Sequence, residues 1–173
     1  MADSTMRAQD SISGKLGSAR IKINATLDRN TNKLVKDSAP HYYKFAQLTK
    51  LEAKWNLNKT DVPIMGQLNT GHKTTGGNGT GSADFHFNTS MFIAIVDFLN
   101  KSGEELRFDT IVENDDKSSA AGVQRTILKD CLLDNVTIAK LDTSTDVLTD
   151  SISFTYDDFT VDEVYKAIGT DTL

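Results

Sequence analysis

Strict alternation of apolar and polar residues is the feature that most limits the folds open to this chain. Residues 51–58 read Leu-Glu-Ala-Lys-Trp-Asn-Leu-Asn, with every apolar side chain two positions from the next. Successive side chains of a β-strand point to opposite faces, so this pattern predicts a strand with one buried face. Residues 21–27 and 82–88 show the same period and are predicted as strands for the same reason.

Further strands are expected over residues 106–113, 124–141 and 147–157, with an irregularity near 130–134. Residues 143–146 are rich in Thr, Ser and Asp and predict a hairpin turn. The chain has 19 Asp, 5 Glu and 20 Thr, which favours strands and turns over helix interiors.

A count of about seven strands predicts a mainly β fold: an antiparallel β-sandwich or partly closed barrel flanked by one α-helix. The expected organisation is an N-terminal arm, 1–18, and a single β domain, 19–173. Within this domain, residues 28–40 are polar and turn-rich and are expected to form a loop or hairpin tip.

One helix is predicted over residues 89–101, because Phe92, Ile95 and Leu99 recur at helical spacing and Gly103 can end it. Most of its circumference is apolar, so it needs cover on more than one side. A short C-terminal helix is expected over 161–168, since Thr160 and Glu163 match a capping box.

The Gly-rich segment 66–81 is predicted to be a flexible loop at a hairpin end. It lacks the Gly-Lys-Ser/Thr ending of a phosphate-binding loop, and the residues that follow it predict a strand rather than a helix. A nucleotide site is therefore not expected there.

Composition and motifs argue against other chemistry as well. The formal net charge of −5 disfavours a dedicated nucleic-acid binder, which needs a basic surface. Three scattered histidines do not predict a metal site, and the single Cys131 is expected to be a small buried hydrophobe. No motif anchors a catalytic triad, so neither an enzyme nor a cofactor is predicted.

The sequence as a whole resembles the tail tube proteins of bacteriophages and of phage-derived particles in Gram-positive bacteria. The similarity follows the family order over nearly the whole chain. Its most specific parts are the glycine stretch and the Ala-Lys-Leu-Asp segment 139–142. The matching stretches are 9–15, 51–53, 58–62, Gly66, 71–76, 79–82, 89–92, 130–136, 139–142 and 154–158. Two departures are a longer segment at 28–45 and Gly77 in place of a common aromatic residue.

The resemblance implies a structural subunit with no catalysis and no cofactor, similar in fold to the tube protein of type VI secretion. It implies hexameric rings that stack into a hollow tube, through which DNA passes without specific binding, or ions in a bacteriocin-like particle. The implied partners are other copies of the chain and the tail sheath, baseplate initiator, tape-measure and tail-terminator proteins. The subunit would lie in the virion tail after assembly in the bacterial cytoplasm, with no insertion into a membrane.

Two sets of residues are candidates for these roles. The lumen-facing candidates lie on the polar faces of the strands that flank the glycine stretch: Glu52, Asn56, Ser82, Asp84 and His86. The candidates for contacts between rings or subunits are Lys59, Gly71, His72, Lys73, Gly76, Gly79, Gly81, Met91 and Phe92, with the arm 1–18. The alternative functions are a carbohydrate-binding module, which needs an exposed aromatic platform, and a small hydrolase, which needs a convergent triad.

Overall fold

The computed structural model describes residues 11–28, 30–31, 33–45 and 47–166. A short 3-10 helix, Gly14–Leu16, precedes the first strand. The strands are β1 (Gly17–Asp28), β2 (Lys33–Lys44), β3 (Leu48–Val62), β4 (Gly71–His86), β5 (Phe108–Asp115), β6 (Val123–Asn135), β7 (Thr149–Tyr156) and β8 (Asp158–Glu163). The helix α1, Met91–Ser102, follows β4. The prediction of a mainly β fold with one flanking helix is thus confirmed.

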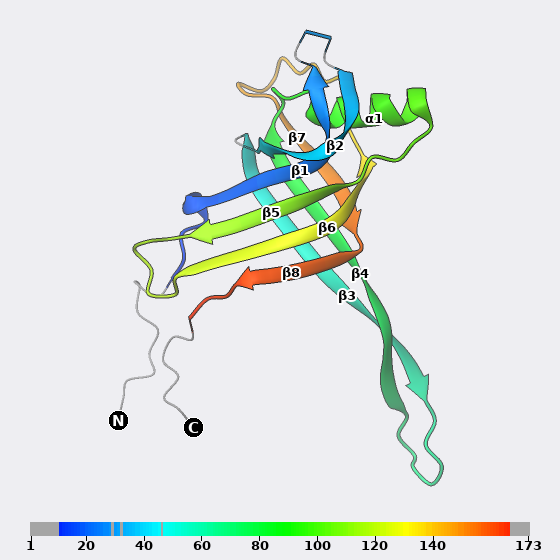
Figure 1. The fold of residues 1–173 in the computed structure, drawn as a ribbon. Helices are drawn as coiled ribbons and strands as arrows, with labels where there is room; N and C mark the ends of the chain where they lie inside the picture. The colour runs from blue at the N-terminus through cyan, green and yellow to red at the C-terminus, as the bar shows by residue number, and fades with distance from the viewer. Residues whose placement is uncertain (1–10, 29, 32, 46, 167–173) are drawn as a thin grey trace.

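Two layers of antiparallel strands share β6 (Figure 1). The strand order is β2-β1-β5-β6-β7-β4-β3, and β8 pairs with the other side of β6. Up to Cys131, β6 pairs with β5 and β8, and from Leu132 it pairs with β7. Asp130, with φ of 54°, lies at this change of partner, where the sequence predicts an irregularity. Such a local distortion lets one strand pass from one layer to the other. Within the described residues no pairing joins β2 to β3, so the sheet does not close into a barrel.

The core lies between the layers and under α1. Ile21 and Ile23 of β1 face this core, and both are buried. The ring of Phe92, on α1, packs against those of Phe45 and Phe85 at centroid separations of 5.2 and 5.5 Å. The helix prediction is confirmed, and Gly103 ends α1 in the left-handed region with φ of 72°.

The predictions for residues 28–40 and 161–168 are wrong. The segment 28–40 is mostly strand, because β2 pairs along β1 from Lys33 to Lys44. The helix expected over 161–168 is also absent from the described residues, since β8 continues to Glu163 and Val161 pairs with Thr126. In both segments the hydrogen bonds to a neighbouring strand outweigh local turn or capping signals. Residues 167 and 168 lie outside the described residues.

The expected N-terminal arm divides into three parts. Residues 1–10 lie outside the described residues, and Gly17 and Ser18 already belong to β1. Between them, the backbone N–H of Ser13 donates to the Asp116 carboxylate at 2.8 Å. The pKa of Asp116 is lowered by hydrogen bonds from the Ser118 hydroxyl and then from the backbone of Ser13 and Ser118. The described end of the arm is therefore attached to the β5–β6 turn.

Candidate functional site

A continuous polar surface covers the outer face of β3, β4 and β7. Glu52 lies opposite Ser82, and Ser82 lies opposite Ser153. Since the side chains alternate, every second residue of each strand belongs to this surface. We call it the polar wall, and its members are Lys50, Glu52, Lys54, Asn56, Asn78, Thr80, Ser82, Asp84, His86, Thr149, Ser151, Ser153 and Thr155. All five lumen-facing candidates lie on it.

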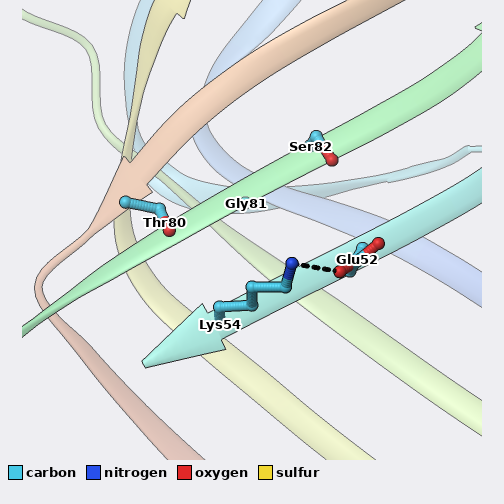
Figure 2. Close-up of a pocket in the computed structure, with 5 residues that line it drawn as sticks. All are labelled: Glu52, Lys54, Thr80, Gly81 and Ser82. Carbon is cyan, nitrogen blue, oxygen red and sulfur yellow. Dashed lines mark ion pairs between the residues drawn. The ribbon is translucent and has the colours of Figure 1, made fainter. Parts of the chain in front are cut away.

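Short polar contacts order the centre of the polar wall (Figure 2). The Lys54 ammonium donates to Glu52 Oε1 at 2.7 Å, and Lys50 Nζ lies 3.4 Å from Glu52 Oε2. Hydrogen bonds from Lys54 and Lys50 hold the pKa of the Glu52 carboxyl below its ordinary value. The Asn56 amide donates to the Thr80 hydroxyl at 3.1 Å. These contacts surround a shallow hollow of about 200 Å³ lined by Glu52, Lys54, Thr80, Gly81 and Ser82.

The charges on the polar wall cancel. Lys50 and Lys54 balance Glu52 and Asp84, and the remaining members carry hydroxyl, amide or imidazole groups. The overall charge of −5 is therefore not concentrated on this face. Such a face offers no cationic field that would hold a nucleic-acid backbone.

The opposite face of the same strands shows why the glycine stretch is not a loop. Gly77, Gly79 and Gly81 belong to β4 and lie under the rings of Trp55, Tyr156 and Phe154. A Cβ atom at Gly79 would lie 2.3 Å from the Tyr156 ring, and one at Gly81 would lie 2.4 Å from the Phe154 ring. The glycines thus make room for aromatic rings, and the predicted loop 66–81 is strand from Gly71 onward.

Four candidates for subunit contacts lie inside the subunit rather than on its surface. Gly79 and Gly81 lie on the inner face against Tyr156 and Phe154. Met91 and Phe92 are only 7% and 2% exposed because they form the buried face of α1. All four pack within their own chain, and their contact with a neighbour stays a prediction.

The other single-residue contact candidates gather on the distal part of the β3–β4 hairpin, residues 58–76. Lys59 pairs with Thr74, and Lys73 pairs with Thr60. His72 Nδ1 lies 2.8 Å from the Asp61 carboxylate, and both side chains are exposed. Gly71 opposes Val62, whereas Gly76, with φ of 147°, lies at a register shift. These residues remain candidates for contacts between copies.

Sequence reasoning missed the tip of this hairpin. Val62 and Ile64 are exposed, and Met65 and Leu68 are fully exposed, which none of the patterns described above indicates. Pro63 ends β3 next to Val62, so the apolar residues that follow lie in the turn. The available signal is Pro63 followed closely by Gly66, which is typical of a turn.

The described residues give little support for a metal site, a reactive thiol or a sugar-binding platform. No group of three His, Cys, Asp or Glu side chains there could hold a metal ion. Cys131 is buried as predicted, and its burial raises its pKa to about 11, which keeps the thiol protonated. The Trp55 ring packs against Tyr156 and Phe159 at 5.8 and 5.4 Å, not on an exposed platform for sugars. None of the described helices has the length and apolar character needed to cross a membrane.

Comparison with known proteins places this architecture in a family. Two relatives from Bacillus subtilis (strain 168) are each 41% identical to the chain. The first, uncharacterized protein YqbM, aligns over 70% of this chain and 83% of its own length. The second, phage-like element PBSX protein XkdM, aligns over 68% and 80%.

Two solved structures share the fold at low sequence identity. The cap of the anti-feeding prophage, described as a tube-terminating cap, matches with a TM-score of 0.57 and 10% identity. This match covers 91% of this chain and 94% of that one. A chain of the same particle's baseplate matches with a TM-score of 0.55 and 14% identity, over 83% and 91%. A family profile described as "Phage tail tube protein" matches residues 4–163, and the chain therefore belongs to the phage tail tube protein family.

Proposed function

We propose that this chain is the structural subunit of a phage-type tail tube, in which hexameric rings stack around a hollow channel. The observation that carries the proposal is the four-stranded layer β6-β7-β4-β3. It has one aromatic inner face and one polar outer face, and β3 forms an edge that no other described strand pairs with. At the other edge, residues 132–135 of β6 pair with β7 alone among the described strands.

Unpaired strand edges favour pairing with another chain, and a closed ring of subunits removes them. In the proposed ring, β3 of one subunit pairs with the free edge of β6 in the next. The polar walls of six subunits then line one channel. A lining of hydroxyls with balanced charge lets DNA pass without being held, because few counterions are released on contact. In a bacteriocin-like particle the same channel would pass ions.

The subunit would act by assembly rather than by catalysis. Its partners would be other copies of itself, the baseplate initiator, the tape-measure and terminator proteins, and a sheath if the tail contracts. It would be located in the tail of the particle after assembly in the bacterial cytoplasm.

Negative-stain electron microscopy with light-scattering mass tests the assembly. We expect hollow tubes or six-fold rings, either from the purified protein alone or after addition of tail baseplates. A 19.0 kDa monomer that stays monomeric at high concentration and on baseplates would contradict the proposal.

Charge reversal tests the lining. Asp84→Lys adds positive charge to the polar wall, so we expect tubes to form but DNA delivery by the particle to fall. Glu104→Lys is the matched control, because Glu104 pairs with Lys36 of β2, away from the polar wall. Equal delivery by both variants would show that the polar wall does not face the channel.

A further inference from the structure

A groove lies between the start of β3 and the inner face of β1 and β5. Its volume is about 820 Å³, within the ~300–1,000 Å³ range of clefts that bury a ligand. Its apolar lining comes from both layers: Ala19, Phe45, Leu48, Leu51 and Val112. Lys15, Lys44, Lys50 and Asn114 also line it. The groove therefore suits an occupant with apolar side chains and carboxylates.

The groove follows the edge of β3 that no other described strand pairs with. Four consecutive residues, Leu48–Leu51, line it. Only every second residue of a strand faces one side of a sheet, so a groove that contacts all four runs along the edge of the strand. The opposite edge of β3 pairs with β4. An occupant of the groove would thus cover the first residues of the free edge.

A free subunit needs such a cover. An open strand edge is a template for pairing with any other chain, and proteins commonly protect it with a loop or a helix. In the proposed ring, the same edge pairs with β6 of the next subunit. The cover must therefore leave when the ring closes, which requires an occupant that is held weakly and can be displaced.

We propose that residues 1–10 of the same chain occupy this groove in the free subunit and shield the start of β3 until a ring forms. The inference rests on the proposed tube, and it adds a control over when subunits join. Ring closure then displaces the segment, because pairing between strands covers the edge more completely.

The described chain leads from the groove into this segment. Gly14 and Lys15 line the groove, and the backbone N–H of Ser13 is fixed by the Asp116 carboxylate at 2.8 Å. Ten further residues can extend over at most about 36 Å, which is ample for a groove that begins beside Gly14. A short tether gives an effective concentration on the order of millimolar, so the segment of the same chain outcompetes that of a second copy.

The charges of the lining also fit this segment. Lys50 is paired with Glu52, whereas Lys15 and Lys44 have no ion-pair partner among the described residues. The segment has two unbranched apolar side chains, two carboxylates and one basic side chain: Met1, Met6, Asp3, Asp10 and Arg7. Methionine adapts to irregular apolar surfaces. The two carboxylates would pair with Lys15 and Lys44.

Disulfide trapping in dilute monomer tests the placement. Thr49→Cys, combined in one chain with Ser4→Cys or with Met6→Cys, should form an intrachain disulfide, which requires Cα atoms within about 7 Å. The native Cys131 is buried with a raised pKa, so it does not compete. Leu68→Cys replaces Thr49→Cys in the control. It lies beyond the far end of β3, which has 15 residues and a length of about 50 Å, outside the reach of the segment.

Charge reversal tests the control over assembly. Asp3→Lys with Asp10→Lys places like charges beside Lys15 and Lys44, so tubes should form at a subunit concentration at least about threefold lower than for the wild type. Adding Lys15→Glu and Lys44→Glu restores opposite charges with the net charge of the wild type. This fourfold variant is the control and should return to the wild-type threshold.

The outcomes separate the inference from the proposed function. Absence of the intrachain disulfide in both Thr49→Cys variants, or disulfides only between copies, would overturn the placement. A threshold that is unchanged or higher in Asp3→Lys/Asp10→Lys would overturn the control over assembly and leave the tube proposal standing. A wild type without rings or tubes would overturn the tube proposal, and the disulfide would still decide whether the segment lies in the groove.

Discussion

The proximal and distal halves of the β3–β4 hairpin have the same antiparallel pairing, but the proximal half is packed against other strands and the distal half is exposed to solvent. In the proximal half, Leu48–Asn56 pairs with Asn78–Phe85, and aromatic rings cover the glycines of β4. In the distal half, residues 58–62 pair with 71–76, and all but Gly71 are exposed. A strand ladder alone therefore does not distinguish a packed element from a projecting one.

The two halves of this hairpin therefore have different roles: the proximal half stabilises the fold, and the distal half is available for assembly. Proximal residues stabilise the subunit because they pack against β7 and β8 through Tyr156, Phe154 and Phe159. Distal residues lack such packing, so their sequence is free to serve a contact with another chain. Four predictions test this division, beginning with the largest effect.

Loss of the Phe154 ring should be the most damaging change. Phe154 is 2% exposed and lies over Gly81 and against Phe108, so Phe154→Ala should lower the free energy of unfolding by about 3–5 kcal/mol. Leu68→Ala at the distal tip should change it by less than about 0.5 kcal/mol. Urea unfolding of the monomer measures both, and similar losses would contradict the division.

Hydrogen exchange should resolve the two halves without any mutation. Under conditions that keep the protein monomeric, paired amides of residues 58–62 and 71–76 should be at least about a hundredfold less protected than those of 50–56 and 78–85. Local opening of an element without core contacts needs far less free energy than global unfolding, and a hundredfold difference corresponds to about 2.7 kcal/mol. Uniform protection along the hairpin would show that the distal half is packed after all.

The glycines under the rings should tolerate no side chain. Gly79→Ala places a methyl group against Tyr156, and we expect a loss of about 1–3 kcal/mol by urea unfolding. Gly14→Ala is the control, because no atom lies within 4 Å of a Cβ there. It should be neutral or slightly stabilising. A neutral Gly79→Ala would mean that the rings move aside freely.

The smallest expected effect concerns the ion pairs of the polar wall. Since the pKa of Glu52 is lowered in the folded chain, its contribution is complete above the ordinary value of 4.5 and is lost as pH falls through the lowered one. The urea midpoint of the wild type should therefore fall slightly more on acidification than that of Glu52→Gln. Parallel profiles for the two proteins would show that Lys50 and Lys54 contribute nothing through this carboxylate.

Much of the candidate site follows from period-two patterning. Glu52 and Asn56 share a face because they are four residues apart on one strand, and Ser82, Asp84 and His86 do so for the same reason. That the two faces join into one surface depends on the register that sets Glu52 opposite Ser82. The balance between two lysines and two carboxylates on this surface also depends on the register, because it places Lys50 beside Asp84.

The glycine stretch resisted prediction because glycine has low strand propensity and no side chain to reveal a period. Its strand is held by pairing with β3 and β7 and by rings that come from Trp55, Phe154 and Tyr156, far away in the chain. The same kind of distant pairing, with β6, overrides the capping signal at Thr160 and Glu163.

Alternation and helical spacing were thus sufficient to identify the principal strands, α1 and the irregularity at Asp130, since these patterns reflect which side of an element faces a core. Only the tertiary structure decided where each core ends. It buried Met91 and Phe92 and exposed Met65 and Leu68. The physical reason is that an apolar side chain has the same local pattern whether it packs in the core of its own chain or lies exposed at the surface.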